Sequence, residues 1–117
     1  MNGCFTKQHR LISPSDFRRV FDTKTRSSDR HFLILASENG LKHARLGLAV
    51  SAKKIKTAVS RNRLKRLIRE SFRQHGMVLA GLDVVVVPQK QILLTSRQDL
   101  RNSLESHWEK VAKCRAS

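Results

Sequence analysis

Cysteines are scarce in this sequence, and their placement excludes two kinds of protein. Cys4 and Cys114 lie at opposite ends of the chain, without CxxC spacing and without a cysteine and histidine cluster. Neither a zinc site nor a disulfide framework is therefore indicated, and we interpret both residues as reduced thiols. The five histidines, at positions 9, 31, 43, 75 and 107, show no ligand spacing. We interpret all of them as structural or solvent-exposed.

Acidic residues are also few, and they are scattered singly. The chain has 9 Asp plus Glu, with no DxD, HxxxH or paired carboxylate motif. Hydrolysis of a phosphodiester through metal ions requires clustered carboxylates that hold the metal. A glycine-rich phosphate loop and a nucleophile motif are missing as well. We therefore predict that this chain alone has no catalytic residue, no metal site and no bound cofactor.

Long apolar runs are missing too. No stretch approaches the roughly 18 residues that indicate a membrane span, and the opening "MNGCFTKQHRLI" lacks the uninterrupted apolar core of a secretory signal. We expect a cytoplasmic protein without a membrane partner. Its 117 residues suit one domain, so we predict a single domain over 1–117, with residues 1–9 flexible.

What the chain has in abundance is positive charge. Its 24 Lys plus Arg leave a formal net charge of +15, which produces a positive field over much of a small surface. Such a field favours phosphate-bearing partners. The basic residues alternate with apolar periodic segments instead of forming a low-complexity run, so the pattern indicates a folded domain and not a disordered tail.

The apolar pattern predicts an α+β fold. A helix opens at "SPSDFRRVF", where Ser13 suits the cap and Pro14 the first helical position. Apolar and β-branched runs predict strands, and spacings of three and four predict two further helices. The predicted order is α-β-β-β-α-β-α, with a sheet of about four strands covered by three helices. The strand segments are 31–37, 44–52 and 83–88, with a short strand within 22–29, and the later helices are 58–75 and 96–115.

The helix that contains "SRNRLKRLIRESFR" has two unlike faces. Leu64, Leu67, Ile68 and Phe72 form an apolar stripe, and Thr57 or Ser60 can cap the helix. At 100° per residue, a set of polar and basic residues falls opposite that stripe. These are Asn62, Lys65, Arg66, Arg69 and Arg73, flanked by Arg61 and Arg63 and preceded by Lys53, Lys54 and Lys56.

This basic face predicts binding to RNA. Nine of the 24 cations lie between positions 53 and 73 with one acid, Glu70, and like charges one turn apart repel. A polyanion relieves that repulsion. A guanidinium fork holds phosphate through two bonds, and Asn62 offers a donor and an acceptor to a base edge or a 2′-hydroxyl.

Two alternatives from other classes stay open at this point. A DNA-binding module would place the basic helix in a major groove, although a helix-turn-helix requires a second helix just before it, where this sequence predicts a strand. A ribosomal assembly protein would instead bind ribosomal RNA.

The segment "KKIKTAVSRNRLKRLIRESFR" closely resembles the arginine-asparagine-arginine signature of the protein subunit of bacterial ribonuclease P. The resemblance extends to "RLGLAVSAKK", "RLISPSDFRRVF" and "DVVVV", over roughly positions 10 to 88. It implies an α/β sandwich with a left-handed crossover around the basic helix. It also implies an accessory subunit of an endoribonuclease that removes the 5′ leader of precursor tRNA, with the chemistry and the magnesium in the RNA subunit. No obligate protein partner is evident.

The resemblance also implies two binding sites. The catalytic RNA subunit would contact Lys53, Lys54, Arg61, Asn62, Arg63, Lys65, Arg66, Arg69 and Arg73. The single-stranded leader would lie between the first helix and the sheet, on Phe17, Phe21 and Phe32. Two positions depart from the family pattern. Leu35 stands where an aromatic residue is frequent, and Pro88-Gln89 stands where Ala-Arg is common.

Overall fold

The order of helices and strands agrees with the prediction. The computed structural model describes residues 14–22, 25–40, 42–49, 55, 57–89 and 96–115, with the side chains of 14–17, 114 and 115 outside the description. The predicted flexible segment 1–9 and both cysteine side chains lie outside the described part of the chain. The elements are α1 (Pro14–Phe21), β1 (Arg26–Ser28), β2 (Phe32–Glu38), β3 (Arg45–Leu48), α2 (Ala58–Gln74), β4 (Leu82–Pro88) and α3 (Arg97–Arg115).

The four strands form one mixed sheet in the order β1-β2-β4-β3. β2 pairs antiparallel with both β1 and β4, whereas β3 and β4 are parallel neighbours. Parallel neighbours require a crossover connection, and α2 lies in the chain between them. The left-handed sense of this crossover stays a prediction.

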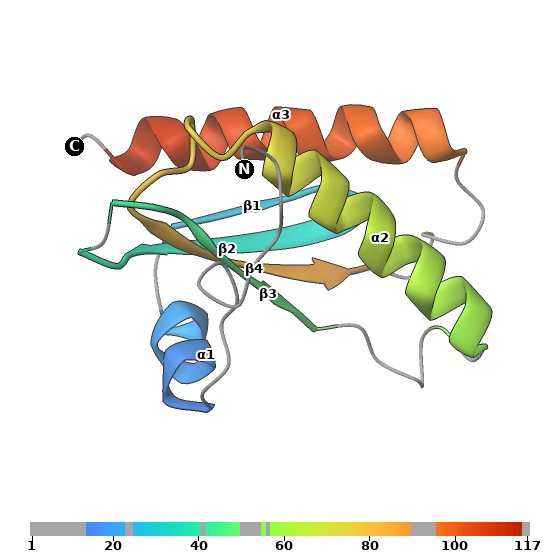
Figure 1. The fold of residues 1–117 in the computed structure, drawn as a ribbon, viewed down its shortest axis with the longest axis horizontal. Coiled ribbons are helices and arrows are strands. Elements are labelled where there is room, and N and C mark those ends of the chain that lie inside the picture. Colours follow the sequence, from blue (N-terminus) through green and yellow to red (C-terminus); the bar gives the residue numbers. More distant parts are fainter. Residues whose placement is uncertain are drawn as a thin grey trace.

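The sheet is covered unequally on its two faces (Figure 1). On one face α2 and α3 cover the main core, which includes Phe32, Ile34 and Trp108. On the other face the short α1 packs Val20 against Leu35 and Val85. Because successive strand side chains point to opposite faces, the apolar run of β2 supplies both layers.

Two helix caps are present, and the structure decides between the two candidates predicted for α2. The Thr57 hydroxyl accepts a 3.1 Å hydrogen bond from the Ser60 backbone amide, so Thr57 and not Ser60 is the N-cap. The Ser96 hydroxyl accepts from the Asp99 amide at 3.2 Å and caps α3. Each cap satisfies a backbone donor that the first turn of a helix leaves unpaired.

His107 is a structural histidine, in line with its sequence interpretation. It is 1% exposed on α3, shares a 2.6 Å hydrogen bond with the Ser27 hydroxyl and lies 3.2 Å from a carboxylate oxygen of Asp29. Burial lowers the pKa of His107, although Asp29 opposes this shift. Asp29 also accepts hydrogen bonds from the Ser103 hydroxyl and from the amides of His31 and Phe32. These contacts join β1 and the turn after it to α3.

None of the described helices is both long enough and apolar enough to cross a membrane.

Candidate nucleic-acid interface

The basic face predicted for α2 lies on the side of the helix that the core does not cover. Leu64, Leu67, Ile68 and Phe72 are buried against the sheet and α3. Of the predicted RNA-binding residues on this helix, Asn62, Arg63, Arg66 and Arg73 are exposed, whereas Arg61, Lys65 and Arg69 are half-buried. The helix therefore presents both faces as the 3.6-residue period predicts.

Arg61 also has a structural contact that the sequence did not indicate. Its guanidinium donates a 2.9 Å hydrogen bond to the carbonyl of Ile55, whose side chain is fully buried in the main core. Arg61 thus ties the segment before α2 to the first turn of the helix. Lys53 and Lys54, the other predicted RNA contacts in this segment, lie outside the described residues.

The start of α2 is electropositive for two reasons. Its first turn contains no acidic residue, so nothing there neutralises the partial positive charge that aligned peptide dipoles place at a helix N-terminus. Arg61 and Arg63 add full charges at the same end. Backbone donors, dipole and guanidinium groups together make this end of α2 attractive to phosphate.

The α1 side of the sheet holds a second, more apolar surface. Phe21 is 42% exposed at the end of α1. Leu33, Ala49 and Val87 pack against the cluster that Val20 forms with Leu35 and Val85, and they stay partly exposed. We call these four residues, Phe21, Leu33, Ala49 and Val87, the α1 surface. The side chain of Phe17 lies outside the description, although its backbone belongs to α1.

Phe32 does not join this surface, contrary to the placement that the resemblance implied. Its side chain is fully buried in the main core, on the face covered by α2 and α3. Leu35, on the opposite face of β2, packs against Val20 of α1 instead. Side chains alternate between the two faces along a strand, and Phe32 and Leu35 are three positions apart, so they point to opposite faces of the sheet. Phe32 is thus a core residue and not part of a leader site.

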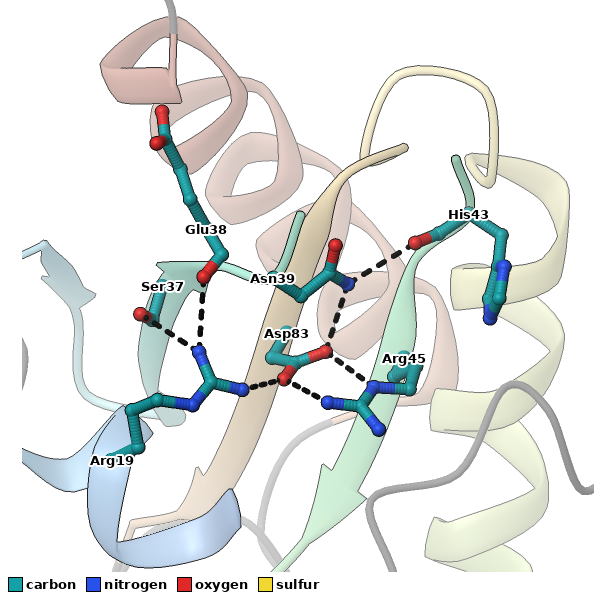
Figure 2. A network of polar contacts seen from close by, with 7 residues as sticks. All are labelled: Arg19, Ser37, Glu38, Asn39, His43, Arg45 and Asp83. Carbon is teal, nitrogen blue, oxygen red and sulfur yellow. Dashed lines mark hydrogen bonds and ion pairs between the residues drawn. The ribbon is translucent and has the colours of Figure 1, made fainter. Parts of the chain in front are cut away.

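A buried carboxylate network that connects the sheet to α1 was not foreseen (Figure 2). The Asp83 side chain, at the start of β4, is fully buried. Arg45 donates to both of its oxygens, from Nε at 2.8 Å and from a terminal nitrogen at 2.6 Å. Asn39 donates to the same carboxylate at 2.9 Å and to the His43 carbonyl at 3.1 Å. Arg19 of α1 contributes a further ion pair.

These partners keep Asp83 ionised. Burial by itself would raise the pKa of this carboxyl, but the hydrogen bonds from Arg45, Asn39 and Arg19, with the charge of Arg45, outweigh burial and lower the pKa. One signal in the sequence pointed to such a site. An acid that opens a continuous β-branched run is buried with the strand, and a buried charge requires partners.

The described residues contain no group of three or more His, Cys, Asp or Glu side chains placed to hold a metal ion. The carboxylates of Asp83 and Asp29 accept hydrogen bonds from protein donors instead.

This arrangement defines a class of protein: a small, strongly basic α+β domain with an exposed cationic helix face.

Comparison with known proteins identifies the family. A family model described as Ribonuclease P matches residues 5–112. The chain is 43% identical over 116 residues to a ribonuclease P protein component from Pseudomonas putida, covering 98% of this chain and 87% of that one. Over 113 residues it is 43% identical to one from Aliivibrio fischeri, with 97% of each chain covered.

Solved structures agree with the sequence comparison. A Staphylococcus aureus RNase P protein mutant with defective mRNA degradation activity superposes with a TM-score of 0.82 at 33% identity, covering 92% of this chain and 90% of that one. The RNase P protein from Thermotoga maritima superposes with a TM-score of 0.75 at 31% identity, covering 86% and 94%.

The chain belongs to the family of ribonuclease P protein components. It is thus a subunit of an endoribonuclease of tRNA processing and acts with an RNA subunit. Nothing in the comparisons favours a DNA-binding module or a ribosomal assembly protein.

Proposed function

We propose that the basic face of α2 binds the catalytic RNA subunit and that the α1 surface binds the 5′ leader of precursor tRNA. The observation that carries the first part is the exposure of Asn62, Arg63, Arg66 and Arg73 on a helix whose first turn has no acid. Phosphate contacts from such a face give affinity without reading sequence.

The α1 surface suits a single strand for a different reason. Unstacked bases pack on exposed aromatic and apolar side chains, and this packing tolerates any base. Phe21 is exposed on α1, and Leu33 and Val87 are partly exposed on the strands against which Val20 of the same helix packs. The α1 side of the sheet therefore offers an extended leader both an aromatic ring and aliphatic side chains. We expect the strongest contact at Phe21 and propose Phe17, on the same helix, as a second contact.

The chemistry is proposed to belong to the RNA subunit together with magnesium. The described carboxylates support this division of labour, because Asp83 and Asp29 are held by protein donors instead of facing a shared metal position. The protein neutralises phosphates and holds the substrate, and we expect the complex to work in the cytoplasm.

Reconstitution tests this division. The purified protein with magnesium and precursor tRNA should leave the tRNA uncut, whereas addition of the catalytic RNA should produce the mature 5′ end at physiological salt. The RNA without the protein is the matched control. Cleavage by the protein alone, persisting after removal of contaminating nuclease, would refute the proposal.

A further inference from the structure

α1 is a short helix, and its described side chains, those of residues 18–21, place one apolar group in the core. It spans eight residues, and a helix of that length is not stable in isolation. Among the α1 side chains that the structure describes, residues 18–21, only Val20 is buried. Polar contacts from the other described side chains of α1 add to the contact of Val20.

Arg19, which precedes Val20 in α1, supplies such contacts. Its guanidinium donates to the Ser37 hydroxyl at 3.3 Å and to the Glu38 carbonyl at 3.0 Å, both at the end of β2. It also forms the ion pair with the buried Asp83 on β4. One side chain thus joins α1 to two central strands of the sheet (Figure 2).

Asp83 is held in place independently of α1. Arg45 of β3 and Asn39, just after β2, both donate to its carboxylate. Its orientation is therefore set by the sheet, which presents a fixed acceptor toward α1. Loss of Arg19 would leave the carboxylate paired with Arg45, so the sheet keeps its buried charge compensated while α1 loses the tie.

We infer that Arg19, through its bridge to Asp83, is a positioning residue that holds α1 on the sheet and thereby sets the geometry of the α1 surface. This inference rests on the leader site proposed above. Val20 supplies an apolar contact between α1 and the sheet, Arg19 supplies directional polar contacts, and the adjacent Phe21 is 42% exposed.

The guanidinium fork is essential to this role. Arg19 contacts a hydroxyl, a carbonyl and a carboxylate at once, a pattern that a lysine ammonium on its flexible stem does not reproduce. Arg19→Lys keeps the charge and loses the fork, whereas Arg19→Gln loses both. Arg18→Gln is the matched control, because it removes the same charge from an exposed neighbour on the same helix.

Two measurements test the inference. The first is hydrogen exchange in the free protein, where the Asp22 amide reports on α1 through its 3.0 Å bond to the Arg18 carbonyl. Arg19→Gln and Arg19→Lys should speed exchange at this amide and leave the β4 amides unchanged, whereas Arg18→Gln should change neither. Unchanged exchange at Asp22 in both Arg19 variants would overturn the inference.

The second measurement uses the holoenzyme assembled with the catalytic RNA. The leader-dependent gain is the affinity of the holoenzyme for precursor tRNA with a leader of several nucleotides, divided by its affinity for the same tRNA without a leader. Arg19→Gln and Arg19→Lys should each reduce this gain about fivefold or more, as expected for loss of a stacked base, with unchanged affinity for the RNA subunit. An equal gain in Arg19→Gln and Arg18→Gln would overturn the functional part, and a wild-type gain in Arg19→Lys would overturn the role of the fork.

The two measurements separate this inference from the proposal on which it rests. A wild-type holoenzyme without any leader-dependent gain would refute the leader site and with it the functional part. The exchange at Asp22 would still decide whether Arg19 holds α1 on the sheet.

Discussion

The indole nitrogen of Trp108 on α3 donates a 2.8 Å hydrogen bond to the hydroxyl of Ser71 on α2. Both residues are buried, at 0% and 6% exposure. The Phe72 ring meets the Trp108 ring edge-on, with centroids 6.1 Å apart at 76°. Because Ser71 lies on the side of α2 opposite the basic face, this contact fixes the helix without using any residue proposed to bind RNA.

Ser71→Ala should therefore destabilise the protein without altering RNA recognition. The variant leaves the indole donor buried without its acceptor, which costs about 1 to 3 kcal/mol. Urea unfolding measures this loss, with Ser106→Ala, an exposed serine on α3, as the control. A loss under about 0.5 kcal/mol, the range of ordinary surface substitutions, would contradict the assigned bond.

Loss of two exposed cations from α2 should weaken binding to the RNA subunit and also its dependence on salt. Arg66→Gln with Arg73→Gln removes two proposed phosphate contacts, so the slope of log affinity against log salt should become shallower by about one to two. The control is Arg97→Gln with Arg101→Gln, which removes the same charge from exposed positions of α3. Equal slopes in the two double variants would show that α2 contributes only general charge.

Phe21→Ala should separate leader binding from stability. Because Phe21 is 42% exposed, its truncation should cost less than the 3 to 5 kcal/mol typical of a buried phenylalanine. The leader-dependent gain in holoenzyme affinity should fall by about 1 to 3 kcal/mol if one base stacks there. A folded variant that retains the full gain would remove Phe21 from the proposed site.

Phe32→Ala provides the opposite pattern in the same experiment. Its ring is fully buried in the main core, so we expect a stability loss of about 3 to 5 kcal/mol. Every activity should decline together as the folded fraction falls. Thermal unfolding and leader binding, measured on both variants, distinguish core from surface.

Stability should decline on mild acidification because of His107. Its folded pKa is lowered by burial, so the unfolded state takes up a proton first, at its ordinary pKa of about 6.5. The free energy of unfolding should therefore fall as the pH decreases below about 6.5. The titratable groups around His107 are Asp29, Lys110 and His31.

The variant His107→Gln should lose this part of the pH dependence. Urea midpoints between pH 5 and pH 7.5 measure it, with His43→Gln as a control outside the cluster. The Asp29 pKa is lowered because hydrogen bonds outweigh burial, so its contribution should disappear only below about pH 4. An unchanged profile between pH 5 and pH 7.5 in His107→Gln would contradict the assignment.

Much of the local structure follows from the sequence. Helical periodicity placed Leu64, Leu67 and Ile68 inside and Arg66 and Arg73 outside, and the structure agrees. The predicted strand at 31–37 begins and ends one residue before β2. The predicted helix at 58–75 ends one residue after α2. These features depend on residues that are close in the chain, so the spacing of residue types in the sequence is enough to predict them.

Only the tertiary structure decided which residues meet across the sheet. The run "FLIL" in β2 is apolar at every position, so a period of two could not assign Phe32 to the core under α2 and α3 or Leu35 to α1. The partners of Asp83 come from α1, from β3 and from the residue that follows β2. Their meeting depends on strand order, which local spacing does not contain, because burial and charge pairing act between segments far apart in the chain.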